Sequence, residues 1–468
     1  MGGGYRVGVA KGRSTGSGWL VAALVVMITL VSTGVWNPFP ALWDWINTSA
    51  TLADPEPRWQ ERLGGRPSSV QSADGVAIVE QRAESVEGRS LTTGAHLWGT
   101  EADWTTVAGP AGRTVVIIGK LLVKGYRVLD PQTGIQVRKN DRAAAVWTWS
   151  NAMIDVTCRN SQDCVLTARE PASGDELWHA DLPGIGSVLF ADNPDLPGLR
   201  PFEVDRADDN LTGNGRMPRY LGFPIDDKLH LVDTRTGEVV RVLKPGKHEE
   251  VYLIGGRVVH SEAKTVSAGC ELHLIGRDAV NGRVVWRRDG YNLGTVSGAA
   301  CDQRSEPLGA GSALLATRPD GRQVLLDGAD GRELLIASQG AKIISTDGVR
   351  AVLRAKDGKT LTAYQLGEPE PLWSRKADPK ATAAVTRTHI LIFDRNPDRI
   401  RVLAPDSGEP ILQVASEAKV LAVVEQGLLL GDRRDLGLLT FPNAQFAVPQ
   451  PAQTSSGVRE PRGREPLG

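Results

Sequence analysis

The sequence has no excess of either charge and little sign of helical periodicity. Its 468 residues contain 54 Lys and Arg against 55 Asp and Glu, which gives a formal net charge of −1. A chain without a basic excess lacks the surface that neutralises phosphates, so nucleic acid is not expected as a partner. Apolar residues spaced as on a helix face are hard to find after residue 60, and the fold is therefore predicted to be all-β.

Motifs that carry chemistry are also scarce. The seven histidines show no H-x-x-x-H spacing, and the sequence has no C-x-x-C, P-loop or G-x-G-x-x-G. No catalytic residue is predicted. The one metal candidate is "DDNLTG", where Asp208, Asn210 and Thr212 have the spacing of a calcium loop. The acid that should complete this loop is missing, so an ordinary exposed loop is the competing interpretation.

A short unit recurs eight times instead. It joins two apolar runs through an Asp/Thr-Gly type of turn, as in "LVDTRTGEVV" at 231–240, and a degenerate copy lies at 363–373. Glycine tolerates the left-handed backbone that such a turn needs. The first six turn glycines are separated by 40, 40, 63, 45 and 49 residues, close to the period of a four-stranded propeller blade. The turn glycines are Gly94, Gly134, Gly174, Gly237, Gly282, Gly331 and Gly408.

A tryptophan marks a fixed place in several copies. Trp98, Trp178 and Trp286 follow their turn glycines by four residues, and Trp373 ends the degenerate copy. A large ring at one place per repeat suits packing between neighbouring sheets. Other copies have Arg138, Arg241, Leu335 or Leu412 at this place. These glycines and tryptophans are therefore predicted to form the repeat turns and the packing between blades.

The x-Asp-x-x-Thr-Gly-x-x-x-Trp turn resembles the repeat of pyrroloquinoline-quinone-like (PQQ-like) β-propellers, over roughly residues 70–445. The resemblance implies an eight-bladed β-propeller. The strand-like runs at 418–441 are expected to pair with the unit at 91–98 and form one blade, and the seven copies between them supply seven more. A ring closed in this way hides its free strand edges.

The resemblance also raises the question of a quinone-dependent oxidoreductase. Enzymes of that kind carry a disulfide between adjacent cysteines near the cofactor, hold a calcium ion with acidic and amide ligands, and use an Asp as base. This sequence has no Cys-Cys pair, and no stretch matches the ligand set. No cofactor, PQQ included, is expected, and the oxidoreductase is kept as an alternative function.

The only long hydrophobic run, "WLVAALVVMITLVSTGVW" at 19–36, has eighteen residues without a charge, the short end of a transmembrane helix. Arg6, Lys11 and Arg13 precede it, so residues 1–18 are expected in the cytoplasm and the propeller outside. We predict a single-pass signal anchor in the cell membrane, with a cleaved signal peptide as the alternative. Residues 37–69 would be a juxtamembrane linker, 70–445 the propeller and 446–468 a disordered tail. The Ala-, Gly- and Arg-rich style is typical of high-GC bacteria such as actinobacteria.

Four cysteines agree with an exported domain. Cys158 and Cys164 flank a five-residue turn between two strand-like runs, and proximity pairs Cys270 with Cys301, although four cysteines allow three pairings. The function predicted from these features is a binding or scaffold module. Its loops would bind a protein or a cell-envelope polymer, and residues 19–36 would bind the lipid bilayer. The alternatives are the oxidoreductase and an extracellular sensor subunit of a membrane complex.

Overall fold

The computed structural model describes residues 51–444, except 83, 161, 185–197, 248, 268, 295, 298–300 and 304–306. The chain divides into two units between residues 50 and 51, and all the described residues belong to the second unit. The predicted membrane segment 19–36 and the tail 446–468 lie outside the described residues. No helix found within the described ranges has the length and apolar character needed to cross a membrane.

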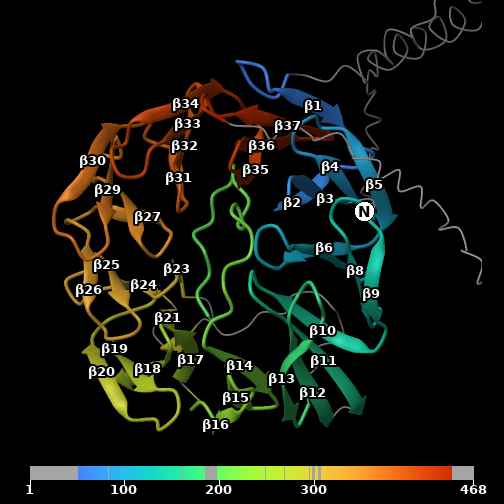
Figure 1. Ribbon diagram of the computed structural model, residues 1–468. Coiled ribbons are helices and arrows are strands. Elements are labelled where there is room, and N and C mark those ends of the chain that lie inside the picture. Colours follow the sequence, from blue (N-terminus) through green and yellow to red (C-terminus); the bar gives the residue numbers. More distant parts are fainter. Residues whose placement is uncertain are drawn as a thin grey trace, which may run out of the picture. The chain divides into compact units, whose positions relative to one another are not determined.

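The described part of Thr51–Gly468 is an all-β propeller. Nine sheets are arranged in a ring, and the strands of each sheet follow one another from the centre toward the rim (Figure 1). Eight of these sheets have four antiparallel strands and one, β14–β16, has three. The strands alternate in direction, so each sheet has two ends. We call the end with the first hairpin and the Thr-Gly turn the turn face, and the opposite end, where one sheet connects to the next, the linker face.

The first four sheets after the chain enters the ring have the following strands. They are β2 (Pro67–Ala73), β3 (Val76–Gln81), β4 (Ser85–Ser90) and β5 (His96–Glu101); β6 (Trp104–Ala108), β7 (Val115–Gly119), β8 (Tyr126–Leu129) and β9 (Gln136–Asn140); β10 (Ala143–Thr148), β11 (Met153–Asn160), β12 (Asp163–Arg169) and β13 (Glu176–Leu182); and β14 (Tyr220–Ile225), β15 (Lys228–Asp233) and β16 (Val239–Leu243).

The next four sheets follow in chain order. They are β17 (Glu249–Ile254), β18 (Arg257–Val266), β19 (Gly269–Asp278) and β20 (Val284–Asp289); β23 (Gly309–Ala310), β24 (Ala313–Thr317), β25 (Gln323–Asp327) and β26 (Glu333–Ile336); β27 (Lys342–Thr346), β28 (Arg350–Arg354), β29 (Thr360–Gln365) and β30 (Pro371–Lys376); and β31 (Thr382–Val385), β32 (Ile390–Arg395), β33 (Asp398–Leu403) and β34 (Pro410–Ala415). A small hairpin, β21 (Val296–Ser297) with β22 (Asp302–Gln303), lies between β20 and β23.

The ninth sheet closes the ring, and it corrects the predicted number of blades. Its strands are β35 (Lys419–Val424), β36 (Gly427–Asp432), β37 (Asp435–Thr440) and, at the rim, β1 (Trp59–Arg62). The prediction of eight blades paired the C-terminal strands with the unit at 91–98. That unit instead has a full sheet of its own, β2–β5, because the polar stretch "PSSVQSA" forms β2. Both the closing sheet and the first sheet are therefore complete, and the ring has nine blades.

Neighbouring blades are joined by the repeat tryptophans. The indole of Trp98 donates to the carbonyl of Pro131 at 2.8 Å, and its ring lies beneath Gly134 of the next turn. A Cβ on Gly134 would lie 2.5 Å from this ring, and the φ of +66° at Gly134 favours glycine independently. Equivalent hydrogen bonds run from Trp178 to Thr234, Trp286 to Gly328 and Trp373 to Pro405.

Two of the copies without tryptophan use an arginine side chain to contact the turn of the next blade. The guanidinium of Arg138 lies against Gly174 and donates to the carbonyl of Ala172 at 2.9 Å. The guanidinium of Arg241 lies against Gly282 in the same way. A planar cation thus takes the place of the indole: it offers a flat face to the glycine and N–H groups to the turn carbonyls.

Candidate functional site

The centre of the ring is crossed by one segment, residues 199–215, which we call the axial segment (Figure 1). It belongs to the insertion that stretches the repeat spacing to 63 residues. The sheet that follows the insertion is the one with three strands, and the strand it lacks is the innermost one. The insertion therefore supplies a central element where a regular repeat would supply an inner strand.

Backbone hydrogen bonds fix the axial segment to inner strands on several sides. Ala207 pairs in parallel with Val420 of β35, and Arg200 pairs in parallel with Leu308 just before β23. The amide of Val423 donates to the carbonyl of Leu211 at 2.7 Å. At the end of the segment, the carbonyl of Gly215 accepts from Ser150 N at 2.8 Å. The segment is a built part of the fold and spans the ring.

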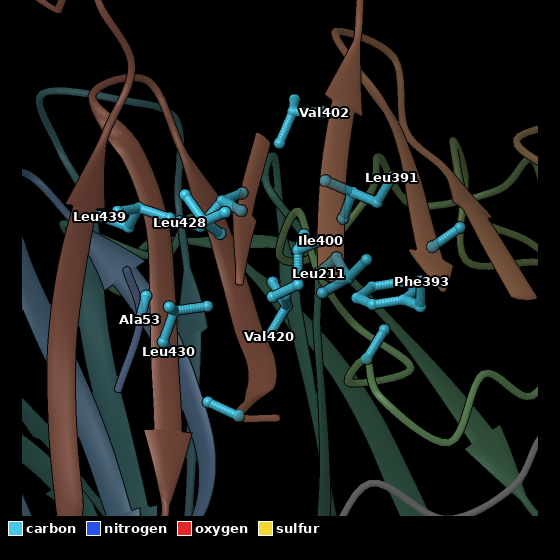
Figure 2. Close-up of a cluster of buried hydrophobic side chains, with 14 of the residues drawn as sticks. Ala53, Leu211, Leu391, Phe393, Ile400, Val402, Val420, Leu428, Leu430 and Leu439 are labelled. Atoms are coloured by element: carbon cyan, nitrogen blue, oxygen red, sulfur yellow. The ribbon is translucent and has the colours of Figure 1, made fainter. Parts of the chain in front are cut away.

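Apolar side chains of the axial segment complete a buried cluster. Val204, Ala207 and Leu211 are less than 9% exposed and pack with residues of β31–β37. Figure 2 shows Leu211 close to Ile400 and Val420 in this cluster. Burying these side chains stabilises the segment by about 1.5–3 kcal/mol for each large residue. The buried residues of the axial segment are Val204, Arg206, Ala207 and Leu211, and the rest of the segment is half-buried or exposed.

A buried arginine provides the polar anchor. The Arg206 guanidinium donates to the carbonyl of Asp394 at 3.1 Å and to the Asp398 carboxylate at 3.2 Å, and it also donates to the carbonyl of Ser416. Burial lowers the pKa of Arg206 from its ordinary value, and the nearby carboxylates of Asp398 and Glu417 oppose that shift. The group remains a cation because an arginine titrates so far above neutral pH.

A pocket of about 330 Å³ opens beside the axial segment on the turn face, and we call it the mouth pocket. It is formed by first-hairpin turns of four successive sheets, starting at the closing sheet, together with the end of the axial segment. Its lining includes Gln71, Ser72, Asp74, Gly75, Leu91, Val107, Gly109, Ala111, Thr114, Ser150, Thr212, Gly213, Asn214, Glu425 and Gln426. Seven of these residues have an amide or hydroxyl side chain, while apolar atoms make up slightly more than half of the exposed wall.

The polar groups of the mouth pocket are held in place. The Asp74 carboxylate accepts from Gly112 N at 2.6 Å and from Thr114 N at 2.9 Å. It therefore stabilises the turn between β6 and β7 of the next sheet. The Asn214 amide donates to Val107 O at 2.8 Å and to Thr148 Oγ1 at 2.7 Å, which ties the axial segment to β6 and β10. The hydroxyl of Thr114 is buried and has no hydrogen-bond partner. Hydrogen bonds therefore hold Asp74 and Asn214 in place, and the charged residues of the lining are two carboxylates, Asp74 and Glu425.

The predicted calcium loop lies in the axial segment. The Asp208 carboxylate accepts from Asn210 N at 3.2 Å and from the Lys419 ammonium at 3.4 Å. Thr212 is exposed and lines the mouth pocket. Across the residues that the structure describes, no group of three or more His, Cys, Asp and Glu side chains is placed to hold a metal ion.

Both predicted disulfides are confirmed. Cys158 and Cys164 lie opposite each other on β11 and β12 and are bonded across the hairpin. Cys270 of β19 is bonded to Cys301, which lies next to β22. The isolated β-bridges of the axial segment, at Arg200 and Ala207, involve none of the four cysteines. Neither disulfide joins cysteines that are adjacent in the sequence.

Comparison with known proteins agrees with the repeat and the fold. A PQQ-repeat family model described as outer membrane protein assembly factor BamB matches residues 271–427. The chain carries a PQQ-like β-propeller. No curated protein sequence matches it.

Solved structures similar to this PQQ-like propeller differ widely in function. BamB from Moraxella catarrhalis is 16% identical, with 84% of this chain and 99% of that chain covered and a TM-score of 0.36. Quinohemoprotein alcohol dehydrogenase ADHIIG from Pseudomonas putida HK5 is 12% identical, with coverages of 84% and 78% and a TM-score of 0.37. The computationally designed Ika8 protein is 12% identical, with coverages of 76% and 98% and a TM-score of 0.36. Likenesses at this level assign no activity to this chain.

The residues around the axis do not fit a quinone with its calcium ion. The axial segment fills the space between the inner strands with Val204, Ala207 and Leu211, and its buried cation, Arg206, is occupied by two backbone carbonyls and Asp398. Asp208, the nearest candidate ligand by sequence, accepts from an ammonium group and a backbone amide. We therefore derive no quinone chemistry from this site.

Proposed function

We propose that this protein is a membrane-anchored, extracytoplasmic binding module that holds a protein or cell-envelope polymer at the mouth pocket. One observation carries the proposal: turns from four successive sheets and the axial segment enclose a pocket of about 330 Å³. Loops positioned by a rigid scaffold are the usual carriers of recognition. The anchor is the predicted transmembrane segment 19–36.

The chemistry of the pocket favours an extended, neutral, polar ligand. Gln71 and Gln426 offer amides, and Ser72 and Thr212 offer hydroxyls. Glu425 is the exposed charge at the rim. Such a wall matches a peptide segment or a glycan chain, which present the same mixture of donors and acceptors. The scaffold's own disulfides support the extracytoplasmic placement, because such bonds persist in oxidising compartments.

Site-specific photocrosslinking in growing cells tests the proposal. A photoreactive amino acid replaces Thr212, which is exposed at the pocket, and in a matched chain it replaces Gln136, which is exposed on the outer strand β9. The full membrane-anchored chain is used. We expect a discrete adduct from position 212 that is absent from position 136.

Two results would count against the binding function. Equal adduct patterns from the two positions would show that the pocket has no partner of its own. The absence of any adduct from position 212 would show that no partner occupies the pocket in these cells. An adduct to an integral membrane subunit would favour the sensor-subunit alternative over a free scaffold.

A further inference from the structure

The turn between β7 and β8 exposes three consecutive apolar side chains. Leu121 is 49% exposed, Leu122 75% and Val123 53%. Lys120 and Lys124, both exposed, flank them. We call residues 120–124 the apolar hairpin tip. Leu122 is more exposed than any other large hydrophobic residue that the structure describes. Water solvates such a cluster poorly, so it indicates a contact surface.

The tip is held in a fixed shape. The amide of Leu121 donates to the Asp103 carboxylate at 2.7 Å, and the amide of Gly125 donates to the carbonyl of Ala143 at 2.8 Å. Leu122 itself has a φ of 62°, a left-handed conformation that is unfavourable for a leucine. The fold therefore presents these side chains outward in one arrangement.

Other sheets have polar or charged residues at the equivalent turn, which lies between the second and third strands, or between the first and second in the three-stranded sheet. These include Arg82, Gln162, Asp226, Asp320, Lys356, Asn396 and Arg433. Among the equivalent turns in the described residues, only 120–124 has three apolar residues in succession. The tip is thus a local feature of one blade and no general property of the repeat.

Cationic side chains surround a groove at the base of the tip. A pocket of about 470 Å³ is lined there by Lys120, Lys124 and Arg127, with Glu101 and Asp141 as its acidic residues. Lys120 is paired with Glu101 at 3.4 Å, and Arg127 donates to the Glu101 carbonyl at 2.9 Å. Apolar side chains at the end and cations behind them match the two layers of an anionic bilayer surface, acyl chains and phosphates.

The chain enters the propeller on the linker face, which is also the face that carries the apolar hairpin tip. Asp54 pairs with Ala415, and the carbonyl of Leu52 accepts from Ser416 Oγ at 2.7 Å. Ser416 N in turn donates to Asp398 O, beside the turn between the second and third strands of that sheet. Leu52 therefore lies on the linker face, as the apolar hairpin tip does. The fifteen or so residues between the predicted membrane segment and Leu52 reach about 50 Å when extended, enough to let this face meet the bilayer.

We propose that the apolar hairpin tip docks into the surface of an anionic lipid bilayer, with Leu121, Leu122 and Val123 among the acyl chains and Lys120 and Lys124 at the phosphates. The contact would turn the linker face toward the membrane and leave the mouth pocket facing away from it. The inference rests on the proposed anchoring, because the tether supplies the high local concentration that a small contact needs.

The test places an environment-sensitive fluorophore at position 122 of the full chain in proteoliposomes. All four cysteines are in disulfides, so Leu122→Cys provides a unique labelling site. The matched control is Ile135→Cys, because Ile135 belongs to the same sheet and is 66% exposed on the turn face. In vesicles of phosphatidylglycerol and phosphatidylcholine, lipids brominated on their acyl chains should quench the label at 122 at least roughly two-fold more than the label at 135.

Charge provides the second readout. Lys120→Glu combined with Lys124→Glu should abolish the quenching at 122, and so should vesicles of phosphatidylcholine alone. Equal quenching at 122 and 135, or quenching that survives both changes, would overturn the proposal. So would an unquenched label at 122 whose position crosslinks to a protein in cells, because the tip would then belong to a protein interface.

Anchoring is checked separately by co-flotation of the chain with the vesicles. A chain that does not co-float contradicts the anchoring part of the proposed function alone. The same labelled chain is then attached through an N-terminal His tag to nickel-chelating lipids, and the comparison of positions 122 and 135 is made in that form.

Discussion

The indole nitrogen of Trp59 donates a hydrogen bond to the carbonyl of Leu91 at 2.9 Å. Its ring lies beneath Gly94, where a Cβ would lie 2.7 Å away. Trp59 is on β1, the rim strand of the closing sheet, and Leu91 is on the first sheet of the ring. This contact therefore repeats, at the point of closure, the packing that Trp98 makes between two successive blades.

We expect Trp59→Ala to destabilise the propeller by about 3–5 kcal/mol, the usual cost of deleting a large buried aromatic side chain. The loss falls on the joint that closes the ring. Equilibrium unfolding in denaturant measures the change, with Leu97→Ala, at a side chain that is 42% exposed, as the control. A cost for Trp59→Ala no larger than that of the control would show that the closing joint contributes little.

Much of the fold follows from the repeat, and the errors have local causes. The turn glycines and tryptophans predicted the blades because each pair is one packing contact. The number of blades was wrong because β1 is only four residues long and β2 is largely polar, so neither shows a clear strand pattern. The Arg138 and Arg241 copies lack the repeat tryptophan, yet their guanidinium groups occupy the place of the indole.

The candidate site was harder to predict. Val204, Ala207 and Leu211 are spaced by three and four residues, a pattern that favours a helix face and gives no sign of a central segment. Their burial depends on strands more than 170 residues later in the chain. The mouth pocket is assembled from turns of four sheets, so no single stretch of sequence carries it. The sequence did contain one signal of this site. The spacing of 63 residues between Gly174 and Gly237 is longer than the other spacings of 40 to 49 residues.

Alanine substitutions at two glycines distinguish the energetic cost of a left-handed backbone from the cost of overpacking. Gly134 and Gly112 both have positive φ, +66° and +82°, but an added Cβ meets Trp98 at 2.5 Å in the first case and nothing within 4 Å in the second. Either change to alanine should cost about 1 kcal/mol for the left-handed backbone. Gly134→Ala should cost a further 1–3 kcal/mol or so through overpacking. Thermal unfolding of the two variants side by side measures the difference, and equal losses would contradict the packing role of Trp98.

The axial segment gives a third prediction. Arg206→Ala removes donors to two buried carbonyls and to Asp398, and we expect it to lower the free energy of unfolding by about 2–4 kcal/mol. Arg216→Ala, at an exposed arginine near the end of the same insertion, is the matched control and should change stability by less than about 0.5 kcal/mol. Proteolysis followed by mass spectrometry gives a local readout, since a released segment is cut near residue 206 first. Protection as strong as in the parent chain would show that Arg206 does not hold it.

The last prediction concerns pH and His389. Burial lowers the pKa of His389 below its usual value of 6.5, and its ring stacks on Phe441 with centroids 4.4 Å apart. The unfolded chain therefore binds a proton at this residue at higher pH than the folded protein does. Between the folded pKa and about 6.5 the unfolded state holds more protons, so stability falls as pH drops through this window.

His389→Phe keeps an aromatic ring against Phe441 and removes the titration. Denaturant unfolding at a series of pH values from neutral to mildly acidic should show a shallower loss of stability in His389→Phe than in the parent chain. The two curves should differ in slope just below pH 6.5 and run parallel well above it, because His389 is neutral there in both states. Parallel curves throughout the window would mean that the ring accepts a proton in the folded protein as readily as in the unfolded chain, and burial would then not be what sets its pKa.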